Sequence, residues 1–395
     1  MIARYIKKDY LLQELVDVGI DPQSLQFFIP KAETLIFKLH DVDARGANIL
    51  KQEFLSAGGD VAINKHVASF KTEKTDIITI GTPKVYKTVI DKLTLEPYFG
   101  LKEVKVALLD AITQKKMKPF TIKGRVFDFE KDFFVMGILN VTPDSFSDGG
   151  KYTNLESALK RTEEMVNEGV DIIDVGGEST RPNAEPVSID EELKRVIPII
   201  NELSKRFPTI PISIDTYKAK VAEEAINSGA DIINDISGLR FDENMVDIAK
   251  RYDTPVVVMH IKGTPKNMQK NPTYENLMKE LLEYFDERIK SLNSFGISKI
   301  IIDPGIGFGK TREHNLTILN RLSEFKIFNV PILMGLSRKS FIGLTLDRSV
   351  DDRLFGTIAS NAFALLEGAS ILRVHDVKPH VDLIKMIKAI KKEGN

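Results

Sequence analysis

Side chains that could bind a ligand or take part in catalysis recur in this sequence at the ends of short apolar stretches. Eight stretches rich in Ile, Val and Leu lie between residues 133 and 376, and each gives way to amide, carboxylate, imidazole or basic groups. Eight stretches with this feature predict a polar binding site, because buried charges cost free energy unless they are paired or meet a ligand. Taken singly, Asp174, Asp235 and Asp376 could equally serve only as ion-pair partners or loop caps. The full set is Asn140, Asp174, Asp215, Asn234, Asp235, His260, Asp303, Lys339, Arg373, His375 and Asp376.

The residue types in this set indicate the chemistry of a ligand. Asp215, Asn234 and Asp303 supply hydrogen-bond acceptors that suit a flat heterocycle rich in N–H groups, such as one with a guanidine-like edge. Arg373 has a planar side chain that can stack on an aromatic ring. Lys339 can donate a hydrogen bond to a ring carbonyl or nitrogen.

The candidates for binding an anionic group are Arg181, His375 and the segment that begins at Ser340. Two nearby motifs resemble catalytic signatures only on the surface. GIGFGK at 305–310 lacks the GxxxxGK[ST] spacing of a phosphate-binding loop, so we interpret its glycines as allowing the backbone to approach a ligand or to turn tightly. SRKS at 337–340 has no evident paired base, which argues against a serine nucleophile.

Composition excludes several other classes of function. The 395 residues contain no Cys, which rules out disulfides, thiolate metal sites and a cysteine nucleophile, and fits a cytoplasmic protein. The 55 Lys and Arg nearly balance the 56 Asp and Glu, so we expect no nucleic-acid partner. The longest apolar runs are only strand-length, so no membrane association is expected. The six His show no HExxH-type spacing, which argues against a zinc enzyme.

The elements that must position the polar residues follow a regular alternation. Near-continuous apolar strands are predicted at 133–140, 171–177, 211–216, 230–236, 255–260, 299–305, 331–337 and 370–376, with an amphipathic helix after each. Several helices end in a Gly that opens the next strand, which is a C-cap signal. This pattern predicts a (β/α)₈ TIM barrel over 119–395, whose active site would form at the carboxyl ends of the strands. An open, doubly wound sheet is the alternative architecture.

A separate small α/β domain is predicted over residues 1–118. Strand-like segments at 33–41, 75–82 and 102–109 accompany a helix near 47–58, and the segment carries no recognisable chemical motif. We interpret it as a stabilising or dimerising appendage, with binding of a partner as the alternative. Between the two regions, TIKGRVFDFEKDFF predicts a β-hairpin that turns near 128–131 and closes the bottom of the barrel.

The sequence resembles a known family, the dihydropteroate synthases. The resemblance covers about 119–395 and is carried by motifs in the family's order: MGILNVTPDSFSDGG, DVGGESTRP, SIDTYKA, IINDISG, VVMHIKGTPKNMQ, IIDPGIGFGK, GLSRKSFIG and ILRVHDV. It implies a TIM-barrel transferase of folate biosynthesis. Such an enzyme condenses 6-hydroxymethyl-7,8-dihydropterin diphosphate with p-aminobenzoate to 7,8-dihydropteroate and pyrophosphate. Ile261, where the family more often has Met, is interpreted as a neutral packing change.

Carried over position by position, the resemblance implies three groups of binding residues. The pterin would contact Asp215, Asn234, Met259, Asp303, Phe308, Lys339 and Arg373, of which Asp215, Lys339 and Arg373 would also be catalytic. The diphosphate would contact Thr180, Arg181, Arg373 and His375. The p-aminobenzoate site would include Thr180, Pro182 and Ser340.

The resemblance also explains why the first apolar strand ends in Asn140 and is followed by a polar loop. Asn140 would be a ligand of Mg²⁺, the implied cofactor, with the substrate diphosphate completing the shell. The loops that carry Asp148 and Arg181 would be mobile and close over the charged substrates. A homodimer is a further implication of the resemblance.

The implied chemistry needs no protein nucleophile. The C–O bond to diphosphate breaks first, the pterin and Asp215 stabilise the carbocation, and the arylamine then attacks; spacing alone does not separate this route from direct displacement. The competing interpretations are a pterin-dependent methyltransferase acting on a corrinoid protein, a synthase for a modified arylamine, and a paralogue that binds pterin without turnover. Retention of Asn140, Arg181, Lys339 and Arg373 favours the synthase.

Overall fold

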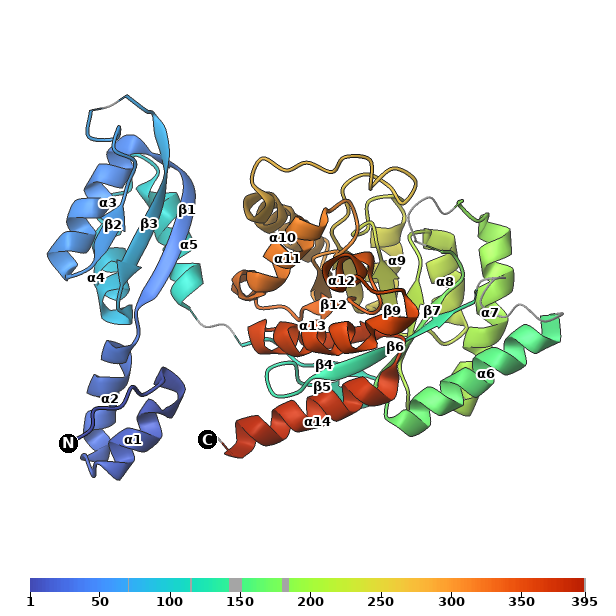
Figure 1. Cartoon of the computed structure of the whole chain (residues 1–395). Coiled ribbons are helices and arrows are strands. Elements are labelled where there is room, and N and C mark those ends of the chain that lie inside the picture. Colours follow the sequence, from blue (N-terminus) through green and yellow to red (C-terminus); the bar gives the residue numbers. More distant parts are fainter. Residues whose placement is uncertain (70, 114–115, 142–150, 180–184, 394–395) are drawn as a thin grey trace. The chain divides into compact units, whose positions relative to one another are not determined.

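The fold was analysed in a computed structural model that describes the chain except residues 70, 114–115, 142–150, 180–184 and 394–395, and the side chains of 151–154 and 393. The chain divides into two compact units (Figure 1). One comprises Met1–Lys115 with Ile390–Asn395, and the other comprises Lys116–Ala389. None of the helices in the described ranges is long and apolar enough to cross a lipid bilayer.

The larger unit is built on eight parallel strands in the order β11-β10-β9-β8-β7-β6-β13-β12. A parallel bridge between Ile302 and Ile332 joins the two ends of this order, so the sheet closes into a barrel. The predicted barrel is therefore confirmed, and the doubly wound alternative is wrong. The strands are β6 (Phe134–Asn140), β7 (Ile172–Gly176), β8 (Ile212–Asp215), β9 (Ile232–Asp235), β10 (Val256–Met259), β11 (Ile300–Asp303), β12 (Leu333–Met334) and β13 (Ile371–Val374).

Helices surround the barrel in Figure 1 and follow the strands along the chain. The glycines predicted to cap them, Gly169, Gly229, Gly296 and Gly368, all have positive φ, between 88° and 116°. The short helix α12 was not predicted. The helices are α6 (Lys151–Glu168), α7 (Ile189–Arg206), α8 (Ala219–Asn227), α9 (Met245–Tyr252), α10 (Leu277–Ser294), α11 (Arg312–Asn320), α12 (Ser340–Leu346), α13 (Leu354–Glu367) and α14 (Val377–Glu393).

The period of two along each strand decides which residues face the barrel interior. In β9, for example, Ile233 packs in the core cluster shared with the surrounding helices, whereas Ile232 packs in a second cluster inside the barrel. The residue two positions after each interior apolar residue must face inward as well. By this rule Asp174, Asn234, Met259, Asp303 and Arg373 belong to an interior layer nearer the carboxyl ends, and Asp215 joins them because it is in register with Asn234.

The amino end of the barrel is closed by the predicted hairpin, β4 (Phe120–Ile122) and β5 (Arg125–Phe127). Phe120 and Phe127 share a buried cluster with the first interior residues of the barrel strands. The predicted turn position was wrong, because the chain reverses at Lys123 and Gly124. Their φ values of 48° and 75° are those of a tight two-residue hairpin turn.

The smaller unit contains an antiparallel sheet in the order β1-β3-β2, formed by β1 (Leu35–Asp43), β2 (Asp60–Ala62) and β3 (Lys74–Gly81). Its helices are α1 (Leu11–Asp17), α2 (Leu25–Phe28), α3 (Ala44–Ala57), α4 (Pro83–Leu93) and α5 (Leu101–Ile112). The strand predicted at 102–109 was wrong, because it lies in α5. Leu101, Val104 and Leu108 are buried there at helical spacing, which the β-branched residues of the segment had obscured.

Candidate active site at the carboxyl end of the barrel

An arginine held between two carboxylates forms the centre of the interior polar layer. Arg373 on β13 donates from Nε to Asp174 Oδ2 of β7 at 2.6 Å and from Nη2 to Asp215 Oδ2 of β8 at 2.6 Å. Asn234 on β9 donates from Nδ2 to both oxygens of Asp174, at 3.2 and 3.3 Å. Four strands are therefore linked by charged or amide side chains, and Asp174 does serve as an ion-pair partner.

Asp215 has one carboxylate oxygen that the fold does not use. Its Oδ2 is bound by Arg373, but Oδ1 is buried and has no hydrogen-bond partner among the described residues. Burial raises the pKa of Asp215 to about 7; Arg373 acts against this rise, while the nearby charge of Asp174 adds to it. A buried, unpartnered oxygen costs about 1–3 kcal/mol, which a ligand N–H group would recover.

Asp303 and Lys339 lie on the other side of the barrel interior. Asp303 Oδ1 accepts a hydrogen bond from Gly305 N at 2.7 Å. A Cβ added at Gly335 would lie 4.0 Å from Asp303 Oδ2 and 3.8 Å from Lys339 Nζ, so these two atoms border the same space. Burial lowers the pKa of Lys339 to about 8, although the charge of Asp303 opposes the shift. Burial also raises the pKa of Asp303.

Apolar side chains border this charged layer. Lys339 Nζ lies 4.7 Å from the centre of the Phe308 ring and donates to the backbone oxygen of Ile306. Phe308 packs against a buried cluster that includes Met259 and Ile261. The predicted apolar lining residues therefore belong to one cluster, beside the charges that they were expected to accompany.

The glycines of the GIGFGK segment, which contains Phe308, pack closely against the backbone of His260 and Lys262. The Cβ of a residue other than glycine would lie 2.0 Å from His260 O at Gly305 and 2.4 Å from Lys262 O at Gly309, so both positions require glycine. Lys310 Nζ is 2.9 Å from His260 Nδ1 and donates to the backbone oxygens of His260 and Phe308, at 3.2 and 3.1 Å. These glycines let the chain turn tightly against the protein's own backbone, which supports the tight-turn interpretation, while close approach of the backbone to a ligand stays a prediction.

Asn140 lies beside Asp215 at the end of β6. A Cβ added at Gly176 would be 3.7 Å from Asn140 Oδ1 and 3.8 Å from Asp215 Oδ2. Gly176 is on β7, between β6 and β8, and is in register with both Asn140 and Asp215. The Asn140 amide oxygen therefore faces the space in front of the Arg373–Asp215 pair, where glycine leaves room for a ligand.

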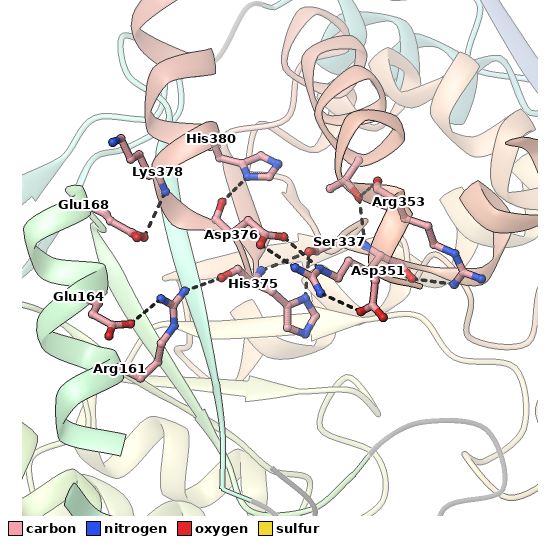
Figure 2. A network of polar contacts seen from close by, with 12 residues as sticks. Arg161, Glu164, Glu168, Ser337, Asp351, Arg353, His375, Asp376, Lys378 and His380 are labelled. Atoms are coloured by element: carbon pink, nitrogen blue, oxygen red, sulfur yellow. Dashed lines mark hydrogen bonds and ion pairs between the residues drawn. The ribbon is translucent and has the colours of Figure 1, made fainter. Parts of the chain in front are cut away.

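His375 belongs to a hydrogen-bond network at the end of β13, shown in Figure 2. Its backbone N–H donates to Ser337 Oγ at 3.2 Å, and its Nδ1 lies 2.9 Å from the same oxygen. Its backbone oxygen accepts from Arg161 Nη2 at 2.8 Å. Arg338, with a φ of 56°, forms a two-point ion pair with Asp376 at 2.7 and 3.1 Å. These contacts fix the 337–340 segment, which ends at the exposed Ser340.

The remaining acidic residue of the set has a structural role. Asp235 is fully buried and accepts from Ser237 N at 2.7 Å and from Leu239 N at 3.1 Å, so it caps the loop after β9. Asp235 therefore serves as a loop cap and Asp376 as the ion-pair partner of Arg338, which are the structural roles that the sequence allowed for them. Sequence reasoning named Asp174 as a possible ion-pair partner, which the Arg373 contact confirms, but missed Lys310 as a member of the site's framework.

Asp148, Thr180, Arg181 and Pro182 lie outside the described residues. The interior layer contains three carboxylates, Asp174, Asp215 and Asp303, and the cationic Arg373, with the Lys339 ammonium at its border. It is chemically suited to a neutral, polar heterocycle that both donates and accepts hydrogen bonds.

Comparisons with known proteins assign this barrel to a family. The family model described as "Pterin binding enzyme" matches residues 136–375. A dihydropteroate synthase from Synechocystis sp. is 44% identical over 285 residues, which are 71% of this chain and 98% of that protein. A solved structure of Xanthomonas albilineans dihydropteroate synthase with 4-aminobenzoic acid is 39% identical, with a TM-score of 0.65, and the match covers 70% of this chain and 99% of that one.

One relative matches nearly the whole chain, including the smaller unit. It is the bifunctional dihydropteroate synthase/dihydropteroate reductase of Helicobacter pylori, 35% identical over 393 residues, which are 99% of each protein. The names of the relatives decide in favour of the synthase and against the methyltransferase. The chain belongs to the dihydropteroate synthase family and is a transferase that makes dihydropteroate.

Proposed function

We propose that Asp215, Asn234 and Asp303 bind the pterin ring of 6-hydroxymethyl-7,8-dihydropterin diphosphate. The observation that carries this assignment is the buried, unpartnered Oδ1 of Asp215, which lacks the N–H donor that a pterin would supply. Asp303 Oδ2 borders the same barrel interior. Lys339 donates to the ring from beside Phe308, and Met259 contributes to the apolar wall.

Arg373 and His375 hold the diphosphate in this proposal, together with Thr180 and Arg181. Arg373 is already bound by two carboxylates, so its charge is oriented before substrate arrives. The p-aminobenzoate carboxylate is received at Ser340, near Thr180 and Pro182. The Xanthomonas relative with 4-aminobenzoic acid supports the choice of arylamine.

Asn140 fits a Mg²⁺ ion that arrives with the diphosphate. No group of three or more His, Asp or Glu suited to a metal occurs among the described residues, so an ion held wholly by protein carboxylates is not expected there. Mg²⁺ commonly uses one or two protein oxygens plus substrate phosphates, and the Asn140 amide oxygen faces the space beside Asp215. When bound, the ion would neutralise charge on the departing diphosphate.

The chain's own residues then perform a substitution at the pterin methylene carbon. The C–O bond breaks, and pyrophosphate leaves with the bonding electrons, held by Arg373 and His375. Ionised Asp215 lies beside the electron-poor pterin and stabilises it. The arylamine lone pair forms the new C–N bond, after which the nitrogen loses a proton. The binding groups supply orientation, which accounts for a reaction without a protein nucleophile.

Pyrophosphate release by the purified chain tests these roles. Release should require both dihydropterin diphosphate and p-aminobenzoate. Asp215→Asn should lower kcat/KM by about 10²-fold or more, as removal of one electrostatic partner does elsewhere. Asn140→Ala should reduce the dependence of the rate on Mg²⁺. Unaltered kinetics in both variants would contradict the residue assignments while leaving the family membership intact.

A second reaction is proposed for the whole chain because the Helicobacter pylori relative aligns across both units. Reduction of the remaining ring C=N bond of dihydropteroate would need a hydride and a proton from an external donor, such as a reduced nicotinamide nucleotide. The full chain should then form tetrahydropteroate with that donor, and a truncated chain starting at Lys118 should form only dihydropteroate. Equal reductase activity in both, or none in either, would exclude a role of the smaller unit in reduction.

A homodimer through α12 and α13 is also proposed. Large apolar side chains there are strongly exposed, including Leu344 at 65%, Phe355 at 83% and Leu366 at 62%. A second copy of the chain offers the same surface and would cover it by twofold symmetry. Phe355→Asp should convert the species seen by light scattering from dimer to monomer; a monomeric wild-type chain would exclude the dimer. The cytoplasmic location stays a prediction.

A further inference from the structure

Ser213 is a buried polar residue to which the protein offers no hydrogen-bond partner. It lies on β8, where Ile212 and Ile214 face the surrounding helices, so the period of two directs Ser213 into the barrel interior on the same face as Asp215. Ser213 is 0% exposed, and its Oγ has no hydrogen-bond partner among the described residues. Folded proteins rarely leave a buried hydroxyl unpaired, so this atom indicates a partner that the chain itself does not supply.

Ser213 lies at the boundary between the apolar and the polar layers of the barrel interior. Among the described residues, every barrel strand except β8 contributes an apolar side chain to the inner cluster that the hairpin closes. Those side chains are Phe134, Met136, Ile172, Ile232, Val257, Ile301, Leu333 and Ile371. Ser213 is in register with Ile232 of this cluster on β9 and with Asp174 of the polar layer on β7. The hydroxyl is therefore the innermost polar group that β8 offers to a ligand in the barrel.

Asp215 provides a second unpartnered oxygen on the same inward face of β8. The two residues are successive inward positions of one strand, about 6.6 Å apart along it. Asp215 Oδ1 is buried without a partner among the described residues, whereas Oδ2 is held by Arg373 at 2.6 Å. Both unpartnered oxygens can accept a hydrogen bond. A ligand with several N–H groups at its inner end would satisfy both.

The orientation of the substrate follows from where its diphosphate is held in the proposed function. His375 follows β13 and Asn140 ends β6, so the diphosphate lies at the carboxyl end of the barrel. The diphosphate is attached through the methylene group at C6 of the pterin, and the 2-amino group is at the opposite end of the two-ring system. The 2-amino group is thus the part of the substrate that enters deepest. It carries two N–H donors, which need two acceptors.

We propose that Ser213 Oγ accepts a hydrogen bond from the 2-amino group of the pterin and is a specificity-determining residue of the substrate site. The proposal deepens the proposed function and rests on the assignment of Asp215, Asn234 and Asp303 to the pterin. A ring without the 2-amino group leaves the Ser213 hydroxyl unpaired in a buried site. Such a ring should be rejected, because nothing compensates for the missing hydrogen bond.

The test is a cycle of two proteins and two ligands, measured by fluorescence titration of the full chain. The ligands are 6-hydroxymethyl-7,8-dihydropterin and its 2-desamino analogue, which has hydrogen in place of the amino group. We expect Ser213→Ala to raise Kd for the pterin by about 5- to 150-fold. The same substitution should change Kd for the analogue by less than about twofold, because the analogue has no group that pairs with the hydroxyl. An unchanged Kd for the pterin, or an equal change for both ligands, would overturn the proposal.

A second substitution separates the hydrogen bond from packing. Ser213→Cys fills the space of the hydroxyl, but a thiol is only a weak hydrogen-bond partner. Pterin affinity should therefore fall in Ser213→Cys as it does in Ser213→Ala. Wild-type affinity in Ser213→Cys would mean that the side chain only fills space, and it would overturn the proposal.

Ser237 is the matched control for folding. It is also 0% exposed, but its Oγ accepts from the backbone N–H groups of Arg240 and Phe241, at 3.0 and 3.1 Å. Ser237→Ala should lower the melting temperature by about 2–4 °C and keep pterin affinity. Ser213→Ala should not lower the melting temperature of the ligand-free chain, since no protein contact is lost. A fall equal to that of Ser237→Ala would assign Ser213 a structural role and overturn the proposal.

Asp215→Asn tests the underlying pterin assignment separately. Unaltered pterin affinity in this variant would contradict the assignment itself. Loss of affinity in Asp215→Asn, with none in Ser213→Ala, would overturn the role of Ser213 alone.

Discussion

Substitution of Asp174 tests most directly whether the interior layer orients the residues that bind the pterin, since Asp174 is buried and is expected to touch no substrate. Asp174→Asn keeps the shape but replaces one carboxylate oxygen by an NH₂ group. Asn234 Nδ2 lies 3.2 and 3.3 Å from the two oxygens, so one of these contacts becomes donor against donor. Rotating the Asn234 amide only exchanges this contact for one between two carbonyl oxygens, and it also presents the opposite end of the amide to the pterin.

The magnitude follows from these contacts. An unmatched hydrogen bond in a buried site costs about 1–3 kcal/mol, which is roughly 5- to 150-fold in Kd for the pterin. Weakening of the charge-assisted bond from Arg373 Nε at 2.6 Å should lower the free energy of unfolding by about 1.5–3 kcal/mol. Asp215 still pairs with Arg373, so the full cost of an isolated buried charge does not arise.

Fluorescence titration with 6-hydroxymethyl-7,8-dihydropterin and urea unfolding measure the two effects. Asp235→Asn is the control, because Asp235 is equally buried and adjacent to Asn234 but is held by the Ser237 and Leu239 backbone N–H groups and the Ser237 side chain rather than by Arg373 or Asn234. It should lose stability and keep pterin affinity. The reasoning is refuted if folded Asp174→Asn binds the pterin within twofold of wild type, or if Asp235→Asn loses as much affinity.

Three further outcomes are expected. The pKa of Lys339 is lowered from 10.5 to about 8, so pterin affinity should fall as the pH rises above about 8. Between about pH 8 and 10.5 the unfolded chain binds more protons than the folded chain, so the free energy of unfolding should rise over this range. A flat profile of pterin binding from about pH 7 to 10 would contradict the first expectation. Gly335→Ala places a methyl group 3.8 Å from Lys339 Nζ, an ordinary contact, so calorimetry should find stability retained while titration finds weaker pterin binding; unchanged affinity would mean that the ligand does not use this space. Lys310→Met leaves the backbone oxygens of His260 and Phe308 without their donor, and should lower the free energy of unfolding by about 1–3 kcal/mol in urea titrations; a neutral effect would show that the ammonium contributes nothing.

The barrel could be predicted from the sequence because its strands are buried on both faces and its helices are amphipathic, so two periods alternate along the chain. Asp215 and Asp303 end such strands, Asn234 is the last residue but one of its strand, and the period of two directs all three inward. The contacts between them could not be predicted in this way. That Arg373 binds Asp174 as well as Asp215 depends on three strands meeting in space, which no local pattern encodes.

The failures have local causes as well. The segment at 102–109 contains valines at alternating positions, which imitate a strand, yet Leu101, Val104 and Leu108 bury a helical face. The hairpin turn was predicted near 128–131, whereas Lys123 and Gly124 supply the positive φ values of the turn. Cβ clearance at Gly305 and Gly309 explains a glycine-rich segment that sequence alone left between two interpretations.

The hairpin that closes the amino end also has a consequence for how the chain is made. Phe120 and Phe127 share their cluster with Ile371, so the hairpin's packing partners are complete only after about 250 further residues have been added. At translation rates of about 5–20 residues per second, that interval is on the order of 10–50 s. The apolar hairpin is synthesised long before the last strand, so the nascent barrel must be protected from aggregation, by a chaperone or by transient contacts, until β13 leaves the ribosome.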